Sequence, residues 1–395
     1  MRRQTIGPRD DWQGKVEALG FGFHTIDGQA YWREDACYVF DEAAVDMLEA
    51  ATAELHGLCL DAVDRIVRTG RYADLGLDDR AARLIERSWF DRDPALYGRM
   101  DLSFDGRSPP KLLEYNADTP TSLFEASVVQ WYWLEDVAPD ADQFNSIHEK
   151  LIERWRVVGG GPRVHFAACY DNPEDATTTD YLLDTCTQAG HAVEALDIES
   201  IGWSGKAFID LADRPIDRLF KLYPWEWLMS EAFAQHIPAS GTRWIEPPWK
   251  MLLSNKAILP ILWEYFPRHP NLLPASRRRE DVEGAVVAKP YWGREGEGIV
   301  VLGPGERGVG LPSQVYQALA PLPVFDGRHA LVGSWIIGDE PAGIGIREDD
   351  DRITRNTSCF VPHFFRVGEQ EHRRSIGSCR AGGGRRLACA PTPGM

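Results

Sequence analysis

The chain has 395 residues, of which 44% are hydrophobic and 26% charged, and its formal net charge is −17. This length permits two or three packed units with a sizeable core, and the acidic balance argues against nucleic acid or an anionic membrane as the main partner. No run of about 18 uncharged apolar residues predicts a membrane span, and no apolar segment behind the N-terminal charges predicts a secretory signal. The seven cysteines lack a Cys-x-x-Cys pair, which is typical of reduced thiols in a cytoplasmic protein.

Residues 40–98 have a mostly helical pattern. Asp41 is a candidate N-cap for a helix over residues 42–55. Strand-like segments follow at 99–104 and 111–116, and the six residues between them are rich in turn formers. We therefore expect a β-hairpin, followed by a helix over residues 122–136 whose apolar positions recur at helical spacing.

The middle of the chain alternates between strand and helix patterns. Strands are expected at 164–169, 192–197 and 218–223, with a helix at about 176–188 between the first two. This rhythm predicts a partly parallel sheet.

The C-terminal third is richer in strands. A helix is expected over 251–265. Strands are expected at 284–289, 299–302, 315–319, 330–337 and 342–347. From Arg366 onward the apolar periodicity disappears, which predicts a disordered tail over residues 366–395.

The hairpin carries a concentrated set of polar side chains. Suppose that Phe104 pairs with Lys111. Asp101 then lies opposite Glu114, and residues two apart on each strand point to the same side. Four polar side chains would then share one face of the two strands: Arg99, Asp101, Glu114 and Asn116. Directly opposed Cβ atoms lie about 4.5–5.5 Å apart, and two carboxylates at that separation repel unless a cation or a proton lies between them. The all-oxygen set suits Mg²⁺, while the alternative is an exposed hairpin with scattered charges.

A glycine-rich turn follows a strand that ends in Lys289. Residues 293–298 hold three glycines, which let backbone N–H groups approach phosphate oxygens, and a lysine adds a point charge. Neither a Walker A loop nor a dinucleotide fingerprint is present, and an ordinary glycine-rich hairpin is the alternative. Lys256 and Arg347 could complete a phosphate site, but each could equally be a surface charge.

Taken together, these segments resemble the glutathionylspermidine synthase-like family of ATP-grasp ligases. The resemblance is carried by residues 99–101, 113–121 and 255–263, by Lys289 with its glycine turn, and by Arg347. It implies a mixed α+β or α/β structure, namely an ATP-grasp fold with an additional N-terminal, pre-ATP-grasp-like α/β part. Residues 1–365 would form one synthetase region, in which 255–365 carry most nucleotide contacts and 99–121 form the metal hairpin and substrate loop.

The resemblance also implies roles for individual residues. The ligands of two Mg²⁺ ions would be Asp101, Glu114 and Asn116. The ATP-binding residues would be Arg99, Lys256, Lys289, Glu295, Gly296, Gln317, Ala318 and Leu319. The acid substrate would meet Asp118, Thr119, Thr121, Glu174 and Asp175. Arg99 and Arg347 would be catalytic, because they would lie beside the reacting phosphate.

The chain departs from the bifunctional members of that family in three ways. It lacks a segment that matches their amidase domain. Leu222 stands where they have a threonine that contacts glutathione, and residues 357–361 hold no clear acid for a polyamine. The acid, which would be a small molecule or a peptide, and the amine, for which a polyamine is one candidate, therefore stay open, as does the oligomeric state.

The expected function is that of a cytoplasmic ATP-dependent carboxylate–amine ligase. It would form an amide through an acyl phosphate and release ADP and phosphate, with the turn at 293–298 acting as a lid. Two alternatives use the same residues: an ATP-dependent phosphotransferase, and a non-catalytic ATP- or amine-binding protein.

Overall fold

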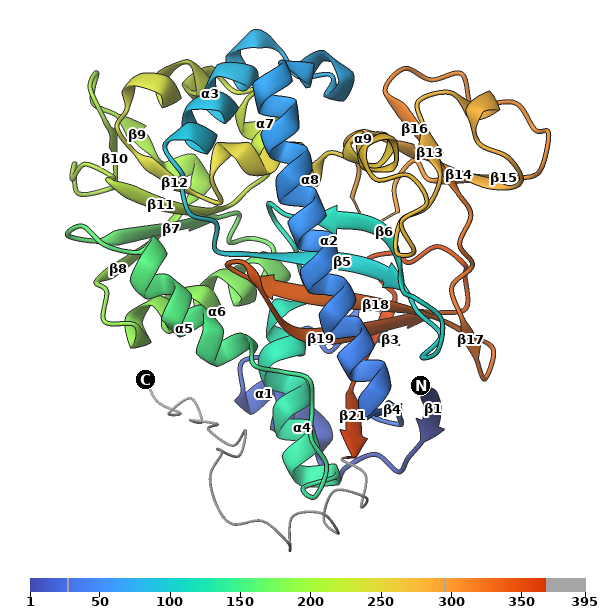
Figure 1. The fold of residues 1–395 in the computed structure, drawn as a ribbon. Coiled ribbons are helices and arrows are strands. Elements are labelled where there is room, and N and C mark those ends of the chain that lie inside the picture. The colour runs from blue at the N-terminus through green and yellow to red at the C-terminus, as the bar shows by residue number, and fades with distance from the viewer. Residues whose placement is uncertain (27, 295, 367–395) are drawn as a thin grey trace, which may run out of the picture.

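The computed structural model describes residues 1–26, 28–294 and 296–366. Figure 1 shows a mixed α/β structure in which several sheets are surrounded by helices, and this confirms the expected fold class at that level. The expected tail, apart from Arg366, lies outside the described residues. A helix long and apolar enough to cross a bilayer is not found among the described residues.

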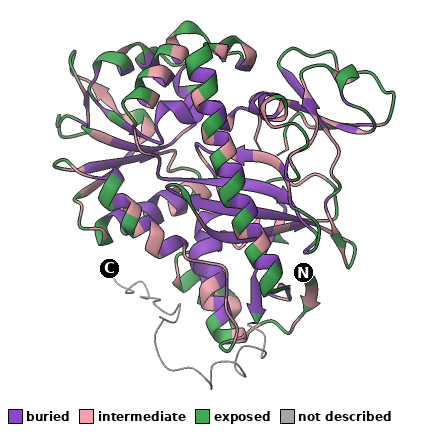
Figure 2. Ribbon diagram, viewed as in Figure 1, coloured by how far each residue is buried: buried purple, intermediate pink, exposed green. Residues whose placement is uncertain are grey.

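The central sheet is antiparallel and joins distant parts of the chain. Its strand order is β20-β19-β18-β5-β6, and the short β17 pairs with β18. The bounds are β5 (Tyr97–Ser103), β6 (Lys111–Asn116), β17 (Val324–Phe325), β18 (Arg328–Ile337), β19 (Glu340–Asp349) and β20 (Cys359–Val361). Because β5 pairs with β18, the hairpin expected from the sequence is joined to residues more than 220 positions downstream. Figure 2 shows β5 and β18 buried in the middle of the molecule.

The hairpin of β5 and β6 has the expected register over its polar half. Asp101 pairs with Glu114, as expected. The register then shifts by one residue, so that Ser103 and not Phe104 pairs with Lys111. The expected pairing of Phe104 is therefore wrong, because Leu113 is an extra residue that forms a β-bulge.

A second sheet is parallel and lies to one side of the central sheet (Figure 1). Its order is β12-β11-β7-β8, with bounds β7 (Val164–Ala168), β8 (Val193–Asp197), β11 (Arg218–Leu222) and β12 (Arg243–Ile245). Helix α6 (Pro173–Gln188) connects β7 to β8 and packs against both strands, and α5 (Ile147–Val158) packs against α6. The expected partly parallel sheet is confirmed.

The third sheet, on the opposite side of the central sheet in Figure 1, is antiparallel with the order β13-β16-β14-β15. Its strands are β13 (Ala275–Ser276), β14 (Val286–Pro290), β15 (Val300–Leu302) and β16 (Gln314–Ala318). Its own apolar cluster holds only five buried residues, Val282, Val286, Ala288, Leu302 and Tyr316. This sheet therefore has far less apolar packing than the central part, which agrees with two exposed valines on β15, Val300 and Val301.

A small outer sheet brings the first and last described strands together. It has the order β1-β4-β21, with β1 (Arg2–Thr5), β4 (Ala36–Asp41) and β21 (His363–Arg366). Two two-stranded ribbons complete the strands: β2 (Thr25–Ile26) with β3 (Gln29–Ala30), and β9 (Gly202–Trp203) with β10 (Phe208–Ile209).

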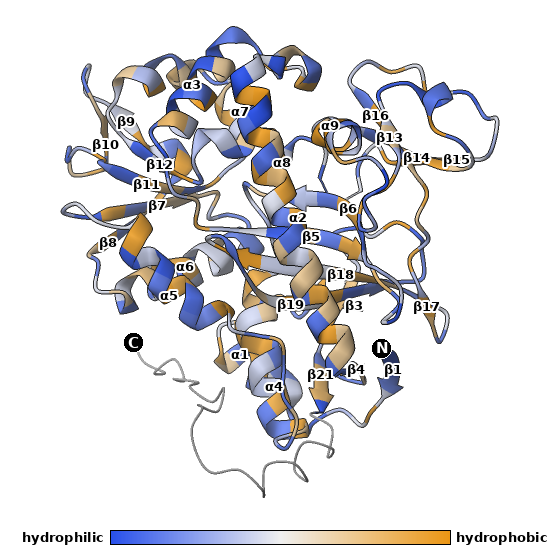
Figure 3. Ribbon diagram, viewed as in Figure 1, coloured by the Kyte–Doolittle hydropathy of each residue, from blue (hydrophilic) through white to orange (hydrophobic). Residues whose placement is uncertain are grey.

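The long helix α2 (Glu42–Thr69) crosses the central sheet (Figure 1). It begins as expected at Asp41, whose carboxylate accepts from the Ala44 N–H, and it ends at Gly70 in the left-handed region (φ 69°). Its buried positions recur every three or four residues, which is the spacing of one helix face, and in Figure 3 its ribbon changes between hydrophilic and hydrophobic colours along its length. Thr52 on that face bonds Ser334 of β18 at 2.7 Å, which fixes the helix against the sheet.

The remaining helices are shorter. They are α1 (Trp12–Ala18), α3 (Asp79–Phe90), α4 (Gln130–Val137), α7 (Trp225–Leu228), α8 (Met251–Ser254) and α9 (Ile258–Tyr265). The single helix expected over 251–265 is wrong, because the chain breaks between α8 and α9 and Lys256 lies in the break. The helix expected over 122–136 forms, but with a π-helical turn at Glu125–Val129.

Candidate active site

The polar face of the hairpin forms the centre of the site. Asn116 Nδ2 lies 3.3 Å from Asp101 Oδ2 and 3.2 Å from Glu114 Oε1, so the three head groups meet on one side of β5 and β6. Arg99 donates to both oxygens of Asp101, at 2.7 and 3.1 Å. The four side chains that the register places on one face therefore contact one another.

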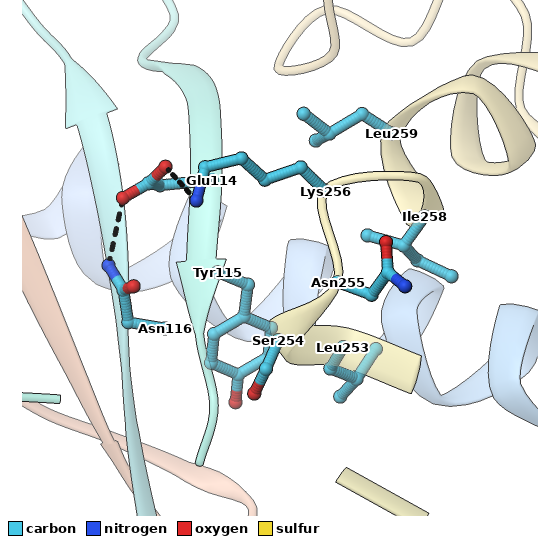
Figure 4. A pocket seen from close by; sticks show the side chains of 9 residues that line it. All are labelled: Glu114, Tyr115, Asn116, Leu253, Ser254, Asn255, Lys256, Ile258 and Leu259. Atoms are coloured by element: carbon cyan, nitrogen blue, oxygen red, sulfur yellow. Dashed lines mark hydrogen bonds and ion pairs between the residues drawn. The ribbon is translucent and has the colours of Figure 1, made fainter. Parts of the chain in front are cut away.

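A lysine from the break between α8 and α9 reaches the same face. Lys256 Nζ lies 3.2 Å from Glu114 Oε2 and donates to Gly293 O at 2.6 Å. Figure 4 shows Glu114 and Lys256 pointing toward each other from the two walls of a small pocket. The break holds Lys256 in position through its neighbour Asn255. The Asn255 side chain accepts from the Ala257 N–H and donates to Leu75 O at 2.8 Å.

The second lysine approaches from the third sheet. Lys289 is almost fully buried and donates to Leu113 O and to Gln317 Oε1, each at 2.8 Å. Gln317 in turn donates to Leu112 O at 2.9 Å. The bulge in β6 thus presents its carbonyl groups to β14 and β16, and it joins the hairpin to the third sheet.

Lys256 and Lys289 shift the pKa of Glu114, and Glu114 shifts the pKa of Lys289. Burial alone would raise the pKa of Glu114, but the ammonium groups of Lys256 and Lys289 outweigh it and hold the pKa well below its usual range. Burial lowers the pKa of Lys289 to about 8, against the opposing charge of Glu114. Two lysines beside a single glutamate leave an excess of positive charge, so this cluster is suited to bind a further negatively charged ligand.

The expected adenine segment lies at the end of β16. Gln317 belongs to the strand, the Ala318 N–H donates to Pro274 O at 2.7 Å, and the Leu319 N–H donates to Ala285 O at 2.9 Å. These contacts place the segment beside β14, the strand that carries Lys289. Its role toward adenine stays a prediction.

The glycine turn between β14 and β15 is held from several sides. Gly296 has a φ of 77°, and an added Cβ would lie 2.9 Å from Thr354 O, so both its conformation and its close packing require glycine. Arg294 donates to Thr119 Oγ1 at 2.5 Å and to Glu226 Oε1 at 2.9 Å. Glu295, expected to bind ATP, lies outside the described residues.

Arg99 and Arg347 line one cavity, although they belong to different strands. Ser122, Asp101 and Gly333 also line it. Arg347 donates to Asn356 O at 3.2 Å and also contacts Arg355 O, while its Nε has no hydrogen-bond partner. Arg347 lies within β19 and does not end the strand, but the structure does bring it to Arg99 as the resemblance implied.

The expected substrate loop is tightly anchored. Asp118 is 1% exposed, and its two oxygens accept from Lys221 Nζ at 2.6 Å and from the Trp225 N–H at 2.8 Å. Thr121 O accepts from Arg99 at 2.6 Å. These bonds join the loop to the parallel sheet on one side and to the hairpin on the other.

The expected acidic pair lies in the first turn of α6, next to Asn172, whose side chain accepts from the Glu174 N–H. Burial raises the pKa of Glu125 and the nearby charge of Glu174 adds to this; burial likewise raises the pKa of Cys169, with a smaller contribution from Asp175. The structure therefore places the pair at the start of α6, near Glu125 of the helix that follows the substrate loop.

Several site residues have no clear signal in the sequence. Arg294 lies in the glycine turn, but its partners Thr119 and Glu226 lie 175 and 68 residues away. Glu125 stands among apolar neighbours that are all buried. A lone acid in such a segment was the one signal in the sequence that could have marked it as a site residue.

The donor set fits a hard divalent cation. Asp101, Glu114 and Asn116 offer carboxylate and amide oxygens, which Mg²⁺ prefers. Among the described residues no three His, Cys, Asp or Glu side chains gather as a metal site, so the amide of Asn116 is needed to complete this one. In this structure Arg99 and Lys256 contact the carboxylates of Asp101 and Glu114, so positive groups already lie beside the proposed metal ligands.

The comparison with protein families covers almost the entire described chain. Residues 3–366 match the model of the family described as glutathionylspermidine synthase preATP-grasp. The chain belongs to this family. The resemblance expected from the hairpin, the lysines and the glycine turn is thereby confirmed.

Curated relatives and a solved structure agree with this membership. A Haemophilus influenzae protein, provisionally named as an acid–amine ligase, is 42% identical over 392 residues, which cover 92% of this chain and all of that protein. The trypanothione synthetase of Crithidia fasciculata is 28% identical over 78% of this chain, and the bifunctional glutathionylspermidine synthetase/amidase of Escherichia coli is 28% identical over 89%. The aligned parts are only 53% and 63% of those two proteins.

The solved structure is a glutathione synthetase-like effector from Globodera pallida. It matches with a TM-score of 0.56 at 11% identity, over 91% of this chain and 98% of that one. At this identity the likeness concerns the fold alone.

Proposed function

We propose that this chain is an ATP-dependent ligase that activates a carboxylic acid as an acyl phosphate and joins it to an amine. The coarser part, a ligase that forms C–N bonds, agrees with the family and with the names of the relatives. The observation that carries the proposal is the meeting of two lysines, two arginines and a metal-type oxygen set around one hairpin face.

The chain's own residues would bind and orient the nucleotide. Lys256 and Lys289 would bind phosphate oxygens, and the glycine turn would cover them in the manner of an ATP-grasp lid. Bound Mg²⁺, held by the oxygens of Asp101, Glu114 and Asn116, would supply positive charge against the phosphates.

The two arginines would act at the reacting group. Arg99 and Arg347 line one cavity next to the hairpin face, so their guanidinium groups would offset negative charge as the γ-phosphoryl passes to the acid. Thr119 and Thr121, at the edge of this region, would position the acid. Both oxygens of Asp118 are already bonded, so we assign this residue to holding the loop in place.

The test is a screen of acids against amines. Glutathione and short γ-glutamyl peptides are combined with polyamines and amino acids, ADP release is followed with a coupled assay, and new amides are identified by mass spectrometry. We expect ADP release that requires both an acid and an amine, with one amide formed per ADP. Asp101→Asn should abolish it, and Lys206→Met, at an exposed lysine, should leave it unchanged.

Two outcomes would overturn the proposal. A phosphorylated product that forms without an amine would indicate a phosphotransferase. Tight ATP binding without turnover for any pair would indicate a binding protein.

A further inference from the structure

Glu125 is a carboxylate in an unusual place. It is 1% exposed and begins the π-helical turn Glu125–Val129, in which all five residues are buried. Within the described parts of the chain, no lysine or arginine forms an ion pair with it, so its charge is not neutralised by direct contact. Burying a carboxylate in this way costs free energy, and π-helical turns occur frequently at functional sites.

A line of hydroxyl groups joins Glu125 to the cavity of the two arginines. The Tyr31 hydroxyl donates to Glu125 Oε1 at 2.7 Å and lies 3.1 Å from Ser122 Oγ. Ser122, which has a φ of 65°, lines the cavity together with Arg99 and Arg347. Positive φ at a non-glycine residue is strained, and such strain is found most often at functional sites.

The hydrogen bonds in this line have one direction. Because the Tyr31 proton points to Glu125, the bond between Tyr31 and Ser122 is donated by Ser122. A lone pair of Ser122 Oγ is then open to a donor in the cavity. Protons can therefore pass from the cavity toward Glu125 through two hydroxyl groups.

The charges around Glu125 suit a proton acceptor. Burial, followed by the neighbouring Glu174, raises the pKa of Glu125 to about 7, while the bond from Tyr31 and the charge of Arg347 act in the opposite direction. A base is most effective when its pKa lies near the working pH.

The proposed reaction needs such an acceptor. An alkyl amine resembles a lysine side chain, whose ordinary pKa is about 10.4, so it arrives protonated and without a free lone pair. Acyl transfer to nitrogen starts only after that proton has been removed.

We propose that Ser122, Tyr31 and Glu125 form a proton relay that deprotonates the incoming ammonium group. The ammonium proton moves to Ser122 Oγ as the Ser122 proton moves to Tyr31 and the Tyr31 proton moves to Glu125. The free amine then attacks the acyl carbon, the C–N bond forms and the bond from carbon to the phosphate oxygen breaks. The second nitrogen proton leaves with the phosphate as hydrogen phosphate. Glu125 later releases its proton to water.

The relay rests on the proposed function, and the experiment separates the two. Wild type, Glu125→Gln and Tyr31→Phe are assayed at pH 6 to 9 with Mg·ATP and glutathione, or with the acid that the screen identifies. Each receives either spermidine or hydroxylamine. Hydroxylamine is largely unprotonated at pH 7, so it can capture an acyl phosphate as a hydroxamate without help from a base. Tyr181→Phe is the matched control, because it removes another buried tyrosine hydroxyl, bonded to His148, from α6.

The relay predicts different results for the two nucleophiles. Both relay variants should slow amide formation at pH 7 by about 100-fold, and the rate should recover as pH rises, whereas hydroxamate formation should change less than about threefold. Glu125→Asp should restore part of the amide rate, and Tyr181→Phe should behave as wild type.

The contrary results are equally clear. Equal loss of both products would show that Glu125 and Tyr31 serve only to hold the structure. An unchanged amide rate would show that the amine loses its proton elsewhere. If the wild-type chain makes neither product from any acid of the screen, the ligase proposal itself has failed.

Discussion

Lys256 Nζ lies 3.2 Å from Glu114 Oε2, so a cation of the protein binds the carboxylate expected to hold Mg²⁺. Arg99 does the same for Asp101, at 2.7 Å. Both cations are also the ones expected to bind phosphate. The approach of Mg·ATP would therefore exchange partners: the metal takes the carboxylates as the cations turn to the phosphates, and metal and nucleotide should bind cooperatively.

Lys256→Met tests this exchange, because metal and nucleotide should respond in opposite directions. The variant frees Glu114, so Mn²⁺ without nucleotide should bind about tenfold more tightly, while ATP should bind at least about tenfold more weakly. Electron paramagnetic resonance measures free Mn²⁺, and calorimetry measures ATP binding. Lys206→Met is the control for loss of one positive charge. Weaker binding of both ligands would show that Lys256 does not compete with the metal.

Arg294→Ala should disconnect the glycine turn from the substrate loop. Its guanidinium donates to Thr119 Oγ1 and Glu226 Oε1 and lies 5.5 Å above the Trp227 ring. We expect the KM for the acid to rise about tenfold while the affinity for ATP changes less than about twofold. Arg278→Ala, at an exposed arginine, is the control. A matching loss of ATP affinity would assign Arg294 to the nucleotide instead.

Lys221→Met should destabilise the fold, because it leaves the Asp118 carboxylate buried without its cation. The pair is buried on both sides, at 0% and 2% side-chain exposure. Breaking such a pair costs about 3–5 kcal/mol, and replacing both partners can recover much of it. Urea denaturation should show this loss for Lys221→Met and a smaller one for the double variant with Asp118→Asn. Equal losses would mean that Asp118 is stabilised by other groups.

The polar half of the hairpin could be predicted from the sequence because its information is local. Alternation along two short strands and a turn between them fix Asp101 against Glu114. The bulge at Leu113 could not be predicted in this way. Its carbonyl accepts from Lys289, 176 residues downstream, and a contact between such distant residues produces no repeating pattern in the sequence.

The break around Lys256 and the role of Glu125 were missed for the same reason. The apolar pattern of residues 251–265 is that of one helix, but Asn255 bonds Leu75 O, 180 residues away, and ends the first helix there. Glu125 is a lone acid among apolar neighbours, and its bond to Tyr31, 94 residues upstream, leaves no local signal in the sequence. The sequence pattern predicts local helices and strands, whereas the site depends on contacts between residues that are far apart in the sequence.

Glu125→Gln should stabilise the protein increasingly as pH rises, independently of any substrate. The pKa of Glu125 is raised from 4.5 in the unfolded chain to about 7 in the fold, chiefly by burial. Between these values the unfolded chain releases the proton and the folded chain retains it, so wild-type stability falls as pH increases.

The variant lacks this titration, and its free energy of unfolding relative to wild type should therefore grow by up to about 3 kcal/mol from pH 4 to pH 8. Urea denaturation at several pH values measures the difference, with Glu283→Gln at an exposed position as the control. A difference that stays constant over this range would show that Glu125 is already ionised in the fold, and it would remove the reason for expecting this carboxylate to accept a proton near neutral pH.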